Sequence, residues 1–266
     1  MTDSSTRLYV LDLGSILLDP SCAMAARSDT GEYRIPVSAF LITHPAGNVL
    51  FDTGMDPLTI TEPEVIWGPV LDQITPEMGE GNHVLKQLEV IGLRPDDIRY
   101  VILSHLHSDH AGAIRFFPGA EFILQRIELE TAMPDSVNLF YPEPYRGARM
   151  DGTLAEPVGS VRLIDGDMDL FGDGRIRMLS TPGHVPGHQS LLVHLDQTGD
   201  VLLTVDACND RGQLDNTVIP DGTWSPEVSR RSLSLLRSLR EKSALTIYGH
   251  DAEQWPTLRH APAFYD

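Results

Sequence analysis

Cysteine is scarce in this chain of 266 residues, which has only Cys22 and Cys208, far apart in the sequence. The two form no Cys-x-x-Cys pair, and this argues against a disulfide framework and against a thiolate zinc site. We therefore expect two free thiols in a reducing compartment.

Long hydrophobic runs are also missing, because no stretch approaches the ~20 apolar residues that a membrane-spanning helix needs. The first residues, Met-Thr-Asp-Ser-Ser-Thr-Arg, lack the basic and then apolar order of a secretory signal. A cytoplasmic protein without a membrane partner is the expectation. Since no linker-like composition divides the chain, residues 1–266 are expected to form a single domain.

Basic residues are few: 20 Lys and Arg stand against 38 Asp and Glu, which gives a formal net charge of -18. Such a surface repels a phosphate backbone, so nucleic acid is disfavoured as a partner. We attribute most of the acidic excess to a solvated surface. The rest could be metal ligands whose charge a bound ion would offset.

One segment, residues 104–110, is unusually rich in potential metal ligands and reads Ser-His-Leu-His-Ser-Asp-His. His105 and His107 are two residues apart, so on an extended backbone they project to one side and can bind one ion. Asp109 and His110 follow as the chain turns into a helix, and they could bind a second ion. Histidine with aspartate suits zinc or a similar cation. A histidine-rich loop without metal is the alternative, which the density of ligands disfavours.

The pattern of apolar residues indicates strands first and then an alternation of strands and helices, twice over. The predicted strands are 8–13, 35–43, 49–51, 100–103, 121–125, 161–164, 175–179, 190–195, 201–205 and 244–248. The predicted helices are 84–92, 111–117 and 225–242. An α/β fold of two sheets packed between outer helices explains this order.

Three further ligand candidates lie just past strand ends, where α/β proteins usually place their sites. His184 follows the strand 175–179, Asp206 closes the apolar run 201–205, and His250 follows the last strand. An aspartate at the end of a buried strand is costly unless its charge is met, and a metal ion would meet it. Each residue alone could be a turn histidine, a helix cap or a surface histidine, but together with the first cluster they indicate a two-metal site.

In residue type and chain order, the ligand candidates together resemble the metal ligands of the metallo-β-lactamase superfamily. The residues that carry this resemblance are His105, His107, Asp109, His110, His184, Asp206 and His250. It implies an αββα sandwich of two mixed sheets flanked by helices, with a paired metal site.

The resemblance also implies how the ligands divide. One metal would take His105, His107 and His184, the other Asp109, His110 and His250, with Asp206 and a hydroxide bridging them. Asp52, in the segment Phe-Asp-Thr-Gly, matches a superfamily position that orders the site. The cofactors implied are two divalent ions, with Zn²⁺ as first choice and Co²⁺, Mn²⁺ or Fe²⁺ as the others that this donor set accepts. His107 stands where the oxygen-reducing di-iron branch has an acidic residue, which favours hydrolysis.

Within the superfamily, residues 105–112, 181–192, 203–207 and 249–251 look like the N-acyl-homoserine lactonases. The segments 35–54 and 261–265 look closest to the γ-butyrolactonase branch. This resemblance implies a quorum-quenching lactonase, in which the bridging hydroxide opens the lactone ring of a small-molecule substrate. Asp109 and Asp206 are the candidate catalytic proton carriers.

Asn209 departs from the lactonase pattern, which usually has a tyrosine three residues after the bridging aspartate. Its amide could donate a hydrogen bond to an oxyanion, so we include it among the catalytic candidates, but it reaches less far and cannot act as an acid. Either the substrate differs, or Tyr141 or Tyr145 takes the role. His188 could hydrogen-bond a ligand or satisfy a turn, and the structural role is favoured.

The alternatives are the hydrolysis of γ-butyrolactone or another small lactone or ester, a glyoxalase-like thioesterase, and a non-catalytic metal-binding module. The thioesterases carry a C-terminal helical domain, whereas only sixteen residues follow His250 here. The acidic charge disfavours a tRNA-processing nuclease. The aromatic residues outside the strands could line an acyl-chain pocket or pack a homodimer contact, and packing is the more common role. They are Trp67, Phe140, Tyr141, Tyr145 and Trp224.

Overall fold

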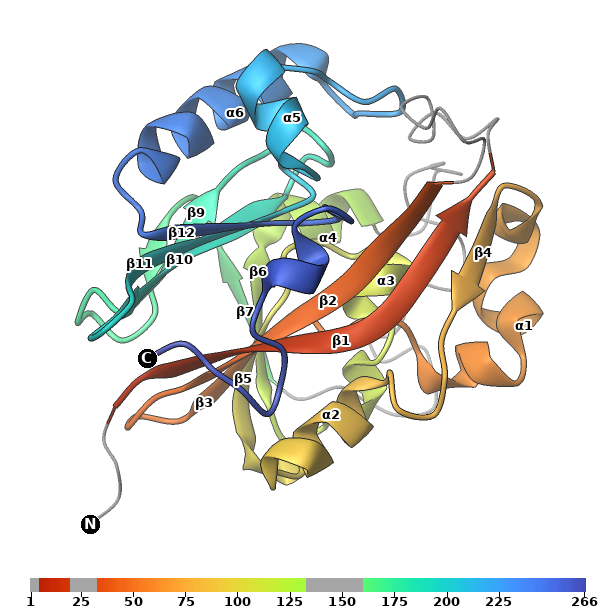
Figure 1. Cartoon of the computed structure of the whole chain (residues 1–266), viewed down its shortest axis with the longest axis horizontal. Helices are drawn as coiled ribbons and strands as arrows, with labels where there is room; N and C mark the ends of the chain where they lie inside the picture. Colours follow the sequence, from red (N-terminus) through yellow and green to blue (C-terminus); the bar gives the residue numbers. More distant parts are fainter. Residues whose placement is uncertain (1–4, 20–32, 133–159) are drawn as a thin grey trace.

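Two β-sheets stack at the centre of the computed structural model, which describes residues 5–19, 33–132 and 160–266 (Figure 1). The first sheet has seven strands, in the spatial order β4 (Ile74–Glu77), β1 (Arg7–Leu18), β2 (Tyr33–Thr43), β3 (Asn48–Phe51), β5 (Ile98–Ile102), β6 (Glu121–Gln125) and β7 (Val161–Ile164). The second has five, in the order β12 (Leu245–Tyr248), β11 (Gly199–Val205), β10 (Gln189–Leu195), β9 (Ile176–Ser180) and β8 (Met168–Asp169). Both sheets are mixed, since β3, β5, β6 and β7 pair in parallel, as do β11 and β12, while the other pairs are antiparallel.

Helices cover the outer face of each sheet. Those on the first sheet are α1 (Pro63–Trp67), α2 (Val84–Ile91), α3 (Ser108–Ala111) and α4 (Arg126–Ala132), and those on the second are α5 (Arg211–Asn216) and α6 (Pro226–Arg240). Short 3₁₀ segments η2 (Pro57–Ile60), η3 (Gly68–Asp72), η4 (Pro95–Asp97), η5 (Ile114–Phe116) and η8 (Trp255–Thr257) complete the described elements.

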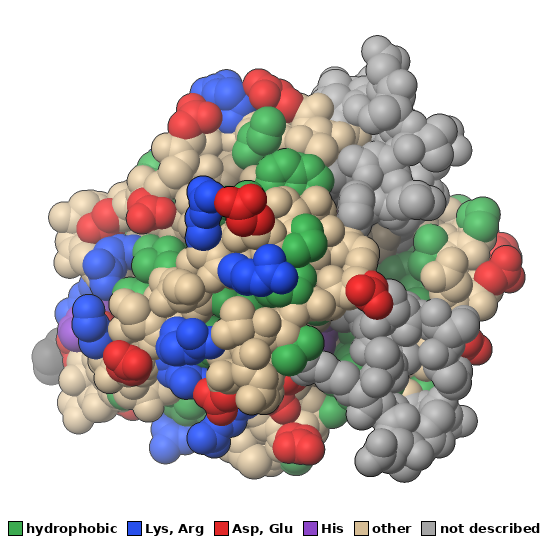
Figure 2. Space-filling view, turned by 90° about the horizontal axis from the view of Figure 1, so that it is seen from above, with side chains coloured by type: hydrophobic (Ala, Val, Ile, Leu, Met, Phe, Trp, Pro, Cys, Tyr) green, Lys and Arg blue, Asp and Glu red, His purple; other side chains and the backbone are tan. Residues whose placement is uncertain are grey.

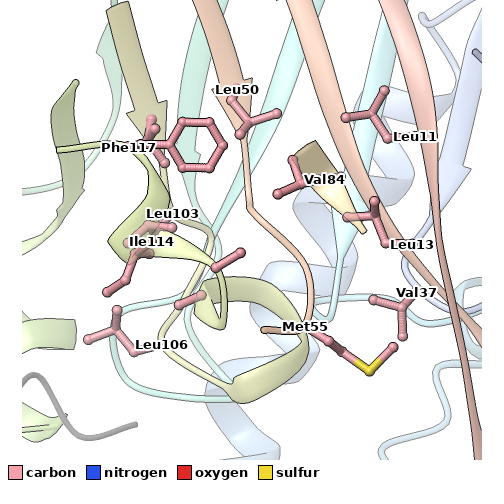
Figure 3. Packing of buried hydrophobic residues seen from close by; sticks show 14 of the residues in the cluster. Leu11, Leu13, Val37, Leu50, Met55, Val84, Leu103, Leu106, Ile114 and Phe117 are labelled. Carbon is pink, nitrogen blue, oxygen red and sulfur yellow. The ribbon is translucent and has the colours of Figure 1, made fainter. Parts of the chain in front are cut away.

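Three layers of buried apolar side chains follow from this order. One lies between the first sheet and its helices, where Leu50 of β3 and Val84 of α2 share a cluster with Phe117 (Figure 3). A second lies between the sheets, and a third lies between the second sheet and α5 and α6, where Leu202 and Leu233 belong to one cluster. Three apolar layers need four layers of structure to enclose them. The predicted αββα sandwich is confirmed.

Local sequence signals explain where α6 begins and where α2 ends. Ser225 accepts a hydrogen bond from Val228 N (3.4 Å) and Pro226 occupies the first turn of α6. The helix α2 ends at Gly92, whose backbone is left-handed (φ 86°), a conformation that glycine adopts at little cost. Both helices were predicted from these residues, and each predicted strand has a counterpart.

The predicted helix 111–117 is wrong. Helix α3 begins and ends earlier, and only the 3₁₀ turn η5 follows it. The cause is Thr53, whose backbone N donates to His110 O (2.7 Å) and whose Oγ1 accepts from Ala113 N (3.1 Å). These bonds occupy groups that a continuing helix would need for its own hydrogen bonds. The short elements α1, α4, α5, β4 and β8 were not predicted.

Several other expectations have a structural outcome. Cys208 is a buried free thiol, whereas Cys22 lies outside the described residues, as do Phe140, Tyr141 and Tyr145. Trp67 is part of the core, and its Nε1 donates to Thr59 Oγ1 (3.1 Å).

Within the described ranges, no helix has both the length and the apolar character needed to cross a membrane. On the face shown in Figure 2, basic and acidic side chains are interspersed, and the described residues there form no continuous basic area.

Candidate metal centre

The seven ligand candidates come together at one edge of the sandwich because each follows a strand. The segment after β5 brings four of them, and the loop after β9 brings His184. Asp206 directly follows β11, and His250 follows the neighbouring parallel strand β12 after one glycine. Parallel neighbours end at the same edge of a sheet, so Asp206 and His250 meet there.

The ligand atoms form three overlapping groups in which all atoms lie within 4.8 Å of one another. The first position comprises His105, His107 and His184, and the Nε2 of His184 lies 3.0 Å from the Nδ1 of His107. The second position comprises Asp109, His110 and His250. The third group, His105, His110 and Asp206, takes one residue from each position. The division that the superfamily resemblance implies is thus geometrically available.

Asp206 lies between the two positions. Its Oδ1 is 3.1 Å from His110 Nε2 and 3.2 Å from His250 Nε2, both in the second position. Its Oδ2 is 3.4 Å from His184 Nε2, in the first position. One carboxylate therefore faces both positions, as a bridging ligand must.

The outer nitrogens of three imidazoles are held by partners on the far side of the site. The Nδ1 of His105 lies 2.9 Å from Ser104 Oγ, that of His110 is 3.0 Å from Asp52 Oδ2, and that of His250 is 2.8 Å from Pro36 O. A hydrogen bond donated from Nδ1 fixes the tautomer that leaves the Nε2 lone pair free for a metal. The Nε2 of His105 is buried and has no hydrogen-bond partner among the described residues. Such buried nitrogens fit a metal site, and the imidazole and carboxylate donors suit Zn²⁺, Co²⁺, Mn²⁺ or Fe²⁺.

Asp52 connects these supports. It is fully buried, and it accepts hydrogen bonds from Ser104 N (2.7 Å), Ser104 Oγ (2.8 Å) and the imidazole of His110. Its backbone is left-handed (φ 62°), a conformation that aspartate tolerates better than most residues. Burial raises the pKa of Asp52, while the hydrogen bonds and the charge of His110 act in the opposite direction. The carboxylate thereby orders His110 directly and His105 through Ser104.

The imidazoles divide into two electrostatic classes. Burial and neighbouring imidazoles hold the pKa of His105 well below its usual value, and burial above all lowers the pKa of His184 to about 3. Burial also opposes the charge on His110 and His250, but the carboxylates of Asp109 and Asp206 raise the pKa of both. His105 and His184 in the first position are thus neutral imidazoles, whereas His110 and His250 in the second hold protons that a bound cation would displace.

These shifts predict that the metal-free protein is most stable near about pH 6.5, the usual pKa of an unfolded histidine. The pKa values of His105, His184 and His188 are lowered, so their stabilising contribution is lost as the pH falls below about 6.5. Those of His110 and His250 are raised, so their contribution is complete below about 6.5 and is lost as the pH rises through the raised values. Urea unfolding of the chelated protein between about pH 4 and about pH 9 measures this. A free energy of unfolding that rises steadily across the range would contradict it.

His188 and Asn209 lie at the margin of the site. The Nδ1 of His188 is 2.9 Å from Thr181 Oγ1, and the residue belongs to none of the three ligand groups. Asn209 is 8% exposed, and its backbone oxygen accepts from His250 N (2.9 Å). The Oδ1 of Asn209 is buried and has no hydrogen-bond partner within the described part of the chain. Trp224 N donates to His184 O (3.0 Å) and its side chain is 46% exposed, while its role in an acyl-chain pocket stays a prediction.

Three residues that support the metal ligands were not predicted from the sequence. Ser104 and Pro36 hold His105 and His250, and the buried carboxylate of Glu128 accepts hydrogen bonds from two ligand loops. Ser104 directly precedes the histidine cluster, and that adjacency was a usable signal. For Pro36, which acts through its backbone oxygen, and for Glu128, the sequence contains no comparable signal.

Comparison with known proteins agrees with this geometry. A family model described as the metallo-beta-lactamase superfamily matches residues 33–250. The N-acyl homoserine lactonase AttM of Azorhizobium caulinodans is 37% identical, with all of both chains covered. The N-acyl homoserine lactonase AiiA of Bacillus thuringiensis subsp. kurstaki is 32% identical over 97% of this chain and 98% of its own.

A solved structure of an N-acyl homoserine lactone hydrolase, with the product N-hexanoyl-L-homoserine bound at its catalytic metal centre, superposes with a TM-score of 0.82. It is 32% identical, and the match covers 98% of this chain and 100% of that one. By the family match, the full-length identities and the shared fold, the chain belongs to the metallo-beta-lactamase superfamily, in the group of the N-acyl homoserine lactonases.

Proposed function

We propose that this protein is a dinuclear metal-dependent hydrolase that opens the lactone ring of N-acyl homoserine lactones. The observation that carries the proposal is the pair of three-ligand positions joined by Asp206, with inward-facing imidazole nitrogens. The full-length relatives named as N-acyl homoserine lactonases support this substrate class. Zn²⁺ is the proposed metal, because its coordination preferences match this histidine and aspartate set.

The residues of the chain have separable tasks in this reaction. Bound divalent ions would supply an acidified water and polarise the lactone carbonyl. His105, His107 and His184 would hold one ion and Asp109, His110 and His250 the other, with Asp206 shared. The Nδ1 partners of His105, His110 and His250 fix the tautomers of these three imidazoles, so their rings need no rearrangement to bind. His107 and His184 instead contact each other through Nδ1 and Nε2 (3.0 Å).

Asp109 is the better proton carrier of the two aspartates. Burial opposes its ionisation, but the neighbouring imidazoles of His110 and His250 lower the pKa of Asp109 to about 2. Its side chain is 14% exposed, against 5% for that of Asp206. Asp109 therefore reaches solvent more readily, while Asp206 is held among three imidazoles. Asp109 would accept the proton that the attacking water loses and deliver it to the departing alkoxide.

The test is lactone ring opening, followed as proton release, on protein of known metal content. Substrates of different acyl length and γ-butyrolactone separate the proposed substrate class from a small-lactone hydrolase. Turnover should disappear on chelation and return with Zn²⁺ or Co²⁺. Absence of ring opening in protein that carries two ions per chain would refute the proposal and direct attention to thioesters and other esters.

Replacing Asn209 by alanine is expected to lower kcat about 100-fold with little change in KM. Removal of one oxyanion donor typically costs this much, because the hydrogen bond strengthens only as charge develops in the transition state. The matched control is Asn216→Ala on α5, whose exposed amide donates to Gly212 O (3.0 Å). Equal kcat values for the two variants would exclude Asn209 from the reaction.

A further inference from the structure

Glu128 of α4 is a fully buried carboxylate that the proposed reaction does not use. Its Oε1 accepts a hydrogen bond from Leu106 N (2.9 Å), and its Oε2 accepts one from Gly187 N (3.1 Å). Leu106 stands between His105 and His107, and Gly187 lies in the loop that carries His184. A single side chain thus holds both backbone segments that deliver the ligands of the first position.

The packing around Gly187 shows how closely this loop lies on α4. A Cβ atom at Gly187 would be 2.3 Å from the Cβ of Glu128 and 2.4 Å from its backbone N, distances that real Cβ atoms essentially never show. Only glycine therefore lets the loop approach near enough for its N–H to reach the carboxylate. The hydrogen bond between Gly187 and Glu128 therefore depends on the close approach of two backbone segments, the loop that carries His184 and helix α4.

The second position has separate supports. His110 is held by Asp52, and His250 is held by the backbone oxygen of Pro36. A carboxylate whose two oxygens each accept an N–H fixes two loops at once, and such outer contacts commonly change metal affinity about 10–100-fold when removed.

We infer that Glu128 is a positioning residue for the first of the two metal positions, which it serves by fixing the His105–His107 segment and the His184 loop together. The inference rests on the dinuclear site of the proposed function. It predicts a selective effect: loss of the carboxylate should weaken the ion at His105, His107 and His184 and leave the other ion in place.

The experiment is metal titration of the metal-free protein and needs no lactone. Glu128→Gln is nearly isosteric, but its amide offers one carbonyl acceptor and places an NH₂ donor against the other N–H. The matched control is Glu130→Gln, two residues along α4, where the side chain is exposed. Equilibrium dialysis with Zn²⁺ gives the two affinities, and Co²⁺ absorption reports the geometry of each ion.

In the Glu128→Gln protein we expect one ion to bind as in the parent protein and the other about 10–100-fold more weakly, while Glu130→Gln binds both normally. Gly187→Ala breaks the same contact from the loop side and should reproduce the pattern if Glu128→Gln folds poorly. Two parent-like affinities in both variants, or an equal loss of both ions, would overturn the inference. A parent protein that binds fewer than two ions would instead contradict the proposed function.

Discussion

Asp206→Asn is expected to lower lactone hydrolysis by at least about 1000-fold, because bound metal contributes several kcal/mol to the transition state and each 1.36 kcal/mol is a factor of ten. The carboxylate faces His110 and His250 through one oxygen and His184 through the other. An amide keeps the shape but removes the negative charge and leaves a single acceptor oxygen, so the two positions no longer share a ligand. Metal content should fall from two ions per chain to one or none.

The measurement pairs metal analysis with initial rates on an N-acyl homoserine lactone. The matched control is Asp200→Asn on the same strand β11, whose carboxylate pairs with His194 (2.7 Å), outside the three ligand groups. The control should keep two ions and parent rates. If Asp206→Asn retained both ions and more than a tenth of the activity, Asp206 could not be the shared ligand.

The ligand residues could be predicted from sequence because their spacing is local. His105, His107, Asp109 and His110 lie within six residues of one another, and Asp206 and His250 directly follow strands that are recognisable from their apolar composition. Because parallel neighbouring strands end at the same edge of a sheet, distant ligands can be placed together even when the side-chain packing is unknown. Spacing separated His105 and His107 from Asp109 and His110, whereas the family resemblance assigned His184, His250 and the bridging Asp206.

Two supports of the site, Pro36 and Glu128, could not be predicted, because each contacts a ligand segment far away in the chain. Asp52, in contrast, was expected from the family resemblance, and Ser104 is adjacent to His105. The carbonyl that holds His250 belongs to Pro36, 214 residues earlier. The predicted helix 111–117 failed for the same reason, since Thr53, 60 residues before Ala113, binds the groups that would have continued it. Local propensity gives no information on such long-range hydrogen bonds, and they decide where the helix ends and which imidazole tautomer is present.

Asp52→Asn is expected to weaken most strongly, about 10–100-fold, the ion at the second position, whose His110 it holds directly, and to lower turnover with it. His105, which Asp52 holds only through Ser104, should be affected less. In the parent protein the Nδ1–H of His110 donates to Asp52, so once a metal displaces the second proton the Nε2 lone pair points toward Asp109 and Asp206. Asparagine suits the left-handed backbone at this position, and its carbonyl can still accept from Ser104 N. Its NH₂ group would then donate to Nδ1, which moves the imidazole proton to Nε2 and removes the metal-binding lone pair.

Nitrogen NMR of the metal-free protein, recorded at a pH high enough for His110 to be neutral, distinguishes this mechanism from a general loss of order, because the two tautomers of His110 have different ¹⁵N shifts. The matched control is Asp56→Asn, four residues along, where a buried carboxylate binds Arg115 (2.9 and 3.0 Å) and belongs to none of the ligand groups. That change should lower the free energy of unfolding, since it breaks a partly buried ion pair, but leave the tautomer and both metal affinities unchanged. A His110 still protonated on Nδ1 in Asp52→Asn, with two ions bound as in the parent, would mean that the aspartate stabilises the fold without selecting the tautomer. The tautomer shift together with loss of one ion would make Asp52 the residue that keeps His110 able to bind metal.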